Sequence, residues 1–179
     1  EDAQGVSFRE LSLDELDDGS VTVSVEYSTL NYKDGLAISG AAPIVQRFPL
    51  VLGIDFSGTV LTSEHAQFAP GDKVVLNGFG ASERLHGGYA GMARLDGNLL
   101  VKLPEAIDTR ASMSIGTAAY TAMLCVLALE DAGIRPDAGP ILVTGAAGGV
   151  GSVAISLLAK LGYEVEASTG RLSEESFLK

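Results

Sequence analysis

The sequence predicts a mixed α/β chain in which a small β-barrel-like domain precedes the first βαβ unit of a parallel-sheet domain. Three observations support this fold class. Residues 21–27 alternate apolar and polar side chains, the pattern of a half-buried antiparallel strand. Short β-like runs joined by glycine-rich turns continue to about residue 110. Residues 141–167 then have the order strand, glycine-rich turn, helix, strand, which is one βαβ unit.

The first predicted domain, residues 1–112, consists mainly of short strands. After the strand at 21–27, β-like runs are expected at 48–52, 56–61, 73–76 and 99–103. Gly71-Asp72-Lys73 and Gly87-Gly88 mark turns between them, because glycine punctuates regular structure. Strands of this length, joined by glycine-rich loops, indicate a small barrel-like sheet.

The second predicted domain, residues 113–179, begins within helical sequence. Asp108 is a suitable N-cap for a short helix at 109–113, and Gly116 interrupts that helix. Residues 117–131 are apolar on nearly every side and precede Gly133, which predicts a buried helix that stops at this glycine.

The βαβ unit follows. A strand is expected at 141–144, a helix at 150–161 and a second strand at 163–167. Glu164 and Glu166 share one side of this second strand, which is unusual for a parallel strand buried on both faces.

Composition argues against several classes of function. The 179-residue chain has a formal net charge of −11 and scattered basic residues, so no nucleic-acid binding is expected. Gly, Asp or Lys breaks the apolar runs before the roughly 18 to 20 residues of a membrane span, and no secretory leader opens the sequence. A soluble, cytoplasmic protein is therefore expected. The lone cysteine, Cys125, is expected in the core. A single cysteine allows neither a disulfide framework nor a cysteine-based zinc site.

A glycine-rich turn, residues 144–151, joins the first strand of the βαβ unit to its helix. Aligned to the G-x-G-x-x-G fingerprint, the three marked positions are Ala146, Gly148 and Gly151. Ala147, Gly149 and Val150 fill the remaining positions. Such a turn lets the backbone approach a pyrophosphate at a helix N-terminus, so a dinucleotide site is predicted. A purely structural turn is the alternative.

The segment after the second strand bears on the choice of nicotinamide cofactor. NAD sites commonly place a carboxylate there, whereas this chain has Ser168, Thr169 and Arg171. Hydroxyls and a guanidinium suit a 2′-phosphate, so NADP(H) is predicted. An ordinary solvated turn is the alternative.

Several motifs resemble those of one known family. They are Leu30 to Leu36, Gly53 to Gly58, Gly71 to Val74, Gly87 to Ala90 and Gly116 to Ala122, followed by the glycine-rich turn. Their order is similar to that of the medium-chain dehydrogenase/reductase superfamily, and residues 31–34 and 122–133 resemble its acryloyl-CoA reductase branch. The resemblance implies a GroES-like β-barrel catalytic domain, lacking its first strand and C-terminal segment, followed by the first part of a Rossmann NADP-binding domain.

The resemblance also implies zinc-free chemistry. Two positions that match zinc ligands in the alcohol dehydrogenases carry Asn31 and Ile54, of which the first is a poor zinc ligand and the second none. No metal is therefore expected. The implied activity is NADPH-dependent reduction of the C=C bond of a short 2-enoyl-CoA such as acryloyl-CoA. Quinone or enone reduction, and non-catalytic nucleotide binding as in crystallin-like relatives, are the alternatives.

Three residues near the start of the chain are the catalytic candidates. Asn31 is a candidate donor to the developing enolate oxygen, Tyr32 a donor or proton source, and Asp34 a residue that fixes their loop. By resemblance, Thr121 would lie beside the nicotinamide and Asp55 below the active-site floor. Asn31 satisfying a turn and Tyr32 packing at the surface are the alternatives.

Three basic residues, Lys33, Arg47 and Arg84, are candidate contacts for coenzyme A phosphates, with ordinary surface charges as the alternative. Members of the superfamily are longer than this chain, so a fragment is expected, either forming a homodimer when full length or completed by another chain. A single βαβ unit does not cover both faces of its own sheet.

Overall fold

The computed structural model describes residues 5–178, and the chain divides into two compact units, Glu1–Thr117 and Ala118–Lys179. This division lies a few residues beyond the boundary expected between 112 and 113. It falls inside α2 (Thr109–Asp131), next to Gly116, whose φ of 55° and ψ of −170° interrupt the helical backbone. The interruption expected at Gly116 is therefore confirmed, as is the cap at Asp108, whose Oδ1 accepts from Ala111 N at 2.7 Å.

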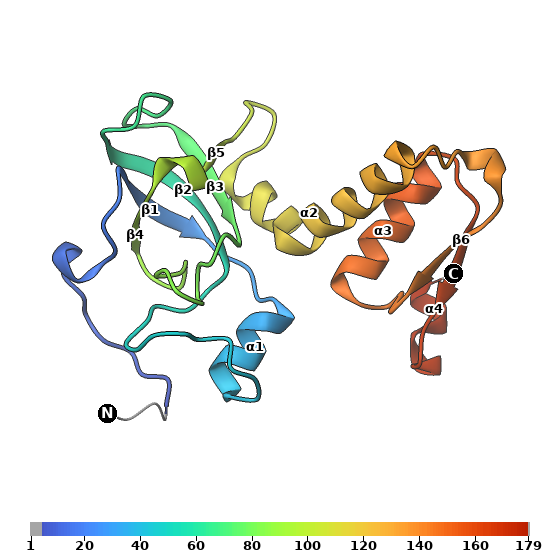
Figure 1. Ribbon diagram of the computed structural model, residues 1–179, viewed down its shortest axis with the longest axis horizontal. Helices are drawn as coiled ribbons and strands as arrows, with labels where there is room; N and C mark the ends of the chain where they lie inside the picture. Colours follow the sequence, from blue (N-terminus) through green and yellow to red (C-terminus); the bar gives the residue numbers. More distant parts are fainter. Residues whose placement is uncertain (1–4, 179) are drawn as a thin grey trace. The chain divides into compact units, whose positions relative to one another are not determined.

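The first unit is built on an antiparallel sheet in the order β4-β1-β2-β3-β5 (Figure 1). Its strands are β1 (Val21–Tyr27), β2 (Asp55–Ser63), β3 (Lys73–Asn77), β4 (Met92–Leu95) and β5 (Val101–Lys102). Short 3₁₀ turns occupy η1 (Leu13–Glu15) and η2 (Gly97–Leu99). The strands expected at 21–27, 56–61 and 73–76 are confirmed, while the run at 99–103 keeps only two residues in a strand.

One side of this sheet forms the core of the first unit. Phe56, Val21, Val23 and Val74 are fully buried there. Val21 and Val23 are two residues apart, as the alternation along a strand requires. Truncating a fully buried aromatic such as Phe56 to alanine costs about 3–5 kcal/mol, so this cluster is a main source of the unit's stability.

The β-like run expected at 48–52 is wrong, because this segment forms a loop. Its backbone acceptors are used by another loop instead of by a strand. Gly87 N donates to Val51 O at 2.8 Å, and Tyr89 N donates to Leu52 O at 2.8 Å. The apolar composition of the run therefore reflects packing between two loops.

A short helix, α1 (Tyr32–Ser39), follows β1 and was not expected from the sequence. Asn31 and Asp34 form a capping box at its start, and Gly40 ends it in the left-handed conformation, with φ of 66°. This polar pair three residues apart is the sequence signal that marks the helix.

The second unit contains the expected βαβ unit. The strands β6 (Ile141–Thr144) and β7 (Val165–Ser168) pair in parallel, and α3 (Gly149–Lys160) connects them (Figure 1). Val126 from α2, Leu158 from α3 and Tyr163 form its buried core. The short elements η3 (Pro136–Ala138), η4 (Leu172–Glu174) and α4 (Glu175–Leu178) complete it.

Two expectations about α2 are wrong. The helix was expected to be buried on every side, yet Met123, Leu124 and Leu127 are exposed, and only Ala122 and Val126 are buried beyond the kink. Cys125 was expected in the core and is exposed. The physical reason is that β6 and β7 are the only strands of this unit among residues 5–178, so α2 packs on it along a single face.

The same small sheet accounts for the acidic residue of β7, Glu166. Glu166 pairs with Leu142, and both side chains are exposed. By length and composition alone, α2 is also the one helix within residues 5–178 that could cross a membrane, although an apolar run of this length was not expected. The kink at Gly116 divides that helix.

Candidate functional site

The glycine-rich turn has the local geometry that the fingerprint requires. Gly145 takes a left-handed φ of 62°, and Gly148 N donates to Gly145 O at 2.8 Å before Gly148 caps α3. Ala146 is fully buried, keeps φ out of the positive range and donates its N–H to Ser168 O at 3.1 Å. Alanine is thus compatible with the first fingerprint position. The turn delivers the chain to the N-terminus of α3, where backbone N–H groups lack helical acceptors.

The last fingerprint position admits no side chain. A Cβ at Gly151 would lie 2.4 Å from Gly145 O and 2.9 Å from the Cα of Ala146. Glycine is therefore needed for the helix to approach the preceding turn this closely.

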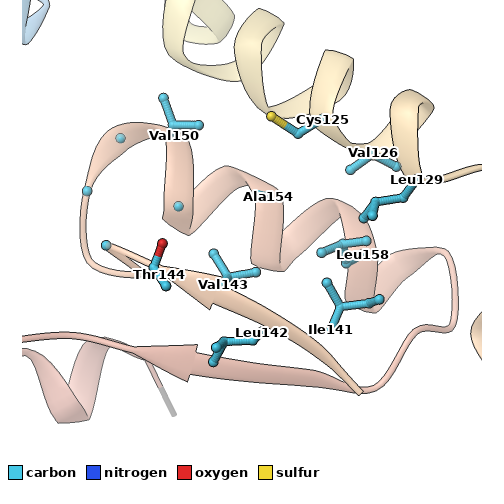
Figure 2. Close-up of a pocket in the computed structure, with 14 residues that line it drawn as sticks. Cys125, Val126, Leu129, Ile141, Leu142, Val143, Thr144, Val150, Ala154 and Leu158 are labelled. Carbon is cyan, nitrogen blue, oxygen red and sulfur yellow. The ribbon is translucent and has the colours of Figure 1, made fainter. Parts of the chain in front are cut away.

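A pocket of about 430 Å³ adjoins this turn (Figure 2). Its wall combines β6, the glycine turn, α3 and one side of α2. Figure 2 shows Val143 pointing from β6 toward α3, whereas Leu142 points to the opposite side of the strand. Cys125 on α2 and Val150 at the start of α3 also line the pocket. The lining is largely apolar, with exposed backbone at the turn, a combination suited to a cofactor.

The polar residues after β7 lie at the same edge of the sheet as the glycine turn. Thr144 and Ser168 are partners in the parallel ladder, so both strands end there. Thr169 Oγ1 accepts from Arg171 N at 3.2 Å. The Arg171 guanidinium is exposed and lies 3.9 Å from the Glu174 carboxylate, which is a loose contact. Arg171 therefore keeps the freedom to approach an anion.

Thr121 lies on α2 about one helical turn beyond the kink, and it is half-buried. Ala118, at the start of the same segment, lies close to the glycine turn, because a Cβ built at Gly149 would be 3.3 Å from the Ala118 Cβ. The role expected for Thr121 stays a prediction.

A second candidate site surrounds the start of α1 in the first unit. A shallow pocket of about 540 Å³ there is lined by Leu30, Asn31, Tyr32, Gly35, Leu36 and Ser39. The Tyr32 side chain is 86% exposed, so its hydroxyl faces solvent. Asp34, by contrast, is fully buried and fixes the loop, since it accepts from Asn31 N at 2.9 Å and from Ile54 N at 3.0 Å.

The Asn31 amide is held from inside the unit. Its Nδ2 donates to Thr29 Oγ1 at 2.9 Å and to Asp55 Oδ2 at 3.0 Å. Because an amide nitrogen carries two protons, both donors are used in this arrangement. To donate to a substrate oxygen, as expected from the sequence, Asn31 must exchange one of these bonds.

Tyr89 also belongs to this region. The sequence places it in the motif Gly87 to Ala90 but predicts no role for its side chain. Its hydroxyl donates to Thr29 O at 2.9 Å, beside the segment that carries Asn31. Burial raises the pKa of Tyr89 far above its usual range, and the Asp34 carboxylate raises this pKa further. Tyr89 therefore stays protonated and acts here as a hydrogen-bond donor.

The basic candidates are mostly paired. Lys33 Nζ lies 2.6 Å from Glu83 Oε1, and Arg47 is bonded to Asp17. These contacts favour the alternative that both are ordinary surface ion pairs. Within residues 5–178, no group of three or more His, Cys, Asp or Glu side chains is arranged to hold a metal ion.

The chain is similar to several known proteins. Residues 17–105 match the alcohol dehydrogenase GroES-like domain. The chain is 54% identical over 173 residues to the probable acrylyl-CoA reductase AcuI of Escherichia coli K12, covering 97% of this chain and 53% of that protein. The chain belongs to the medium-chain dehydrogenase/reductase superfamily.

Other known proteins are similar over nearly the whole chain. The acrylyl-CoA reductase AcuI of Ruegeria pomeroyi is 55% identical, over 96% of this chain and 52% of that protein. The yhdH oxidoreductase of Salmonella enterica, solved in complex with NADP, superposes with a TM-score of 0.93 at 53% identity, over 96% of this chain and 53% of that one. Bacillus subtilis yhfP, solved with NAD bound, gives 0.90 at 42% identity, over 97% and 53%. The chain spans about half the length of the relatives it matches.

Proposed function

We propose that the chain is part of an NADPH-dependent reductase that reduces the C=C bond of a short 2-enoyl-CoA, such as acryloyl-CoA, without a metal. The observation that carries the proposal is the identity of 54% and 55% to two acrylyl-CoA reductases, which extends over both units. It is supported by the glycine turn, whose geometry suits a dinucleotide.

The second unit fits such a cofactor. The glycine turn exposes its backbone beside the free N–H groups of the first turn of α3, an arrangement that binds phosphate groups. The apolar wall that includes Val143 and Ala154 suits the flat rings of the ligand. Ser168, the last residue of β7, and Thr169 and Arg171, which follow it at the same edge, would hold a 2′-phosphate. NADPH supplies the hydride when bound.

The first unit would bind and polarise the acyl group. We assign the donor to the carbonyl oxygen to Tyr32, whose exposed hydroxyl borders the shallow pocket at the start of α1. Asn31 shapes the pocket floor and donates to the substrate only by giving up a bond to Thr29 or Asp55. Asp34 keeps both residues in place by capping α1.

Steady-state kinetics on the complete protein test this function. NADPH oxidation with acryloyl-CoA is expected to exceed that with simple quinones or with a small enone. A reversed preference supports the quinone reductase alternative. That alternative is favoured by the 42% identity to the putative quinone oxidoreductase YhfP of Bacillus subtilis. Nucleotide binding without turnover of any acceptor means a non-catalytic protein and contradicts the proposal.

Assembly is also proposed. Leu142, on one side of β6, is 60% exposed. Parallel sheets are normally covered on both faces. We infer that further chain, or a second subunit of a homodimer, covers this surface. Light scattering of the complete protein measures the subunit number, and a monomer with Leu142 accessible to solvent would contradict the inference.

A further inference from the structure

Asp55, at the start of β2, is fully buried and binds two segments that are far apart in the sequence. Its Oδ1 accepts from Thr29 N at 3.1 Å and Thr29 Oγ1 at 2.8 Å, and its Oδ2 accepts from Asn31 Nδ2 at 3.0 Å. On the other side, Oδ2 accepts from Thr117 N at 3.1 Å and Thr117 Oγ1 at 2.8 Å. One carboxylate therefore connects the segment before α1 to a residue of α2.

The residue on the α2 side occupies a special place in the chain. Thr117 is the last residue of the first unit, and it directly follows the kink at Gly116. A Cβ at Gly116 would lie 3.2 Å from Thr29 Cγ2 and 3.6 Å from Asp55 Oδ2, so the kinked backbone itself rests on this cluster. We call residues 116–118 the joint.

We propose that Asp55 is a positioning residue that holds Asn31 and the joint residue Thr117 on one carboxylate, so that a change at either segment is transmitted to the other. The donors that meet Asp55 are all N–H or O–H groups, which only an acceptor satisfies. Asn in its place turns an N–H group toward donors, and Ala removes the acceptor that the two segments share.

The effect of Asp55 on catalysis rests on the proposed function. Asn31 and Tyr32 border the shallow pocket assigned to the acyl group, so a loosened segment before α1 impairs the use of acryloyl-CoA. Nucleotide binding by the glycine turn does not pass through Asp55 and is expected to stay unchanged.

The decisive variant is Thr117→Val, which removes the hydroxyl and keeps the backbone N–H bond to Asp55. In the complete protein, kcat/KM for acryloyl-CoA is expected to fall roughly tenfold, the effect of one hydrogen bond to a charged group, while the Kd for NADPH stays unchanged. Thr117→Ser retains the hydroxyl and is expected to restore the rate. Ser114→Ala serves as the control, because Ser114 is exposed on α2 and its hydroxyl donates within its own helix, to Arg110 O at 3.2 Å.

Amide hydrogen exchange and unfolding free energies test the connection between Thr29 and Thr117 without an activity measurement. Thr117→Val is expected to speed amide exchange at Thr29, across the carboxylate, and Asp55→Asn to speed exchange at Thr29 and Thr117 together. Unfolding free energies of Thr29→Val, Thr117→Val and the double variant are expected to be non-additive.

The outcomes separate this inference from the proposed function. Additive stabilities with unchanged exchange at Thr29 would overturn the positioning role, whatever the activity. If the wild-type protein reduces no acceptor but the exchange at Thr29 responds to Thr117→Val, the link stands and the proposed function fails.

Discussion

The hydroxyl of Thr109, the first residue of α2, donates to the Glu26 carboxylate at the end of β1, at 2.6 Å. Lys73 Nζ, 2.7 Å from the same carboxylate, and the Thr59 hydroxyl complete the cluster. Four segments of the first unit thus meet at one side chain, which anchors the helix to the sheet.

Glu26 predicts an acid-sensitive contribution to stability. Its hydrogen bonds, led by that from Lys73, lower the pKa of Glu26 from 4.5 to about 2. Since the folded-state pKa is depressed, the stabilisation is complete above pH 4.5 and is lost as the pH falls toward 2. Glu26→Gln is expected to flatten this part of the pH profile, measured by denaturant unfolding. Glu105→Gln, at an exposed position, is the control and keeps the wild-type profile.

His86 predicts a second pH dependence, nearer neutrality. Its Nδ1 accepts from Val51 N at 2.9 Å, so the ring must be neutral with its proton on Nε2. Burial lowers the pKa of His86 from 6.5, although the Asp17 carboxylate opposes the shift. The folded state therefore loses stability as the pH falls below 6.5. Nitrogen-15 NMR of the ring at neutral pH is expected to show the Nε2–H tautomer; the Nδ1–H form would contradict the assignment.

Gly116→Ala is expected to destabilise the protein by about 1–3 kcal/mol, the usual cost of a side chain in a backbone region suited to glycine. The new methyl group would also press on Thr29. Gly35→Ala in α1 is the matched control, because a Cβ there meets nothing within 4 Å. Alanine at this helical position is expected to stabilise by roughly 0.5–1 kcal/mol. Equal effects of the two substitutions on thermal unfolding would refute the role of the kink.

Arg171→Ala tests the choice of cofactor. If the guanidinium meets a 2′-phosphate, the variant loses affinity for NADPH roughly tenfold or more and keeps its affinity for NADH. Fluorescence titration with both nucleotides measures the ratio. Lys160→Ala, an exposed basic residue at the end of α3, is the control and is expected to leave both affinities unchanged. A parallel loss for both nucleotides in Arg171→Ala would assign this residue to another part of the ligand.

Local patterns were enough to predict much of the fold. The alternation of residues 21–27, the cap at Asp108, the break at Gly116 and the glycine turn are properties of neighbouring residues, so the sequence alone determined them. The superfamily followed from the order of such local motifs. The same locality explains why β4 and the short helix α1 were not predicted. The four residues Met-Ala-Arg-Leu of β4 give little periodic signal, and α1 is marked by a single capping pair.

The tertiary structure decided what depends on partners distant in the chain. Residues 48–52 are a loop because Gly87 and Tyr89, from another loop, donate to the Val51 and Leu52 carbonyl groups. Cys125 is exposed because α2 packs along one face only. No sequence pattern relates Asp55 to Thr117, which are 62 positions apart. Their contact exists because folding buries a carboxylate where several donors converge, and a buried acceptor gathers its partners from wherever the chain brings them.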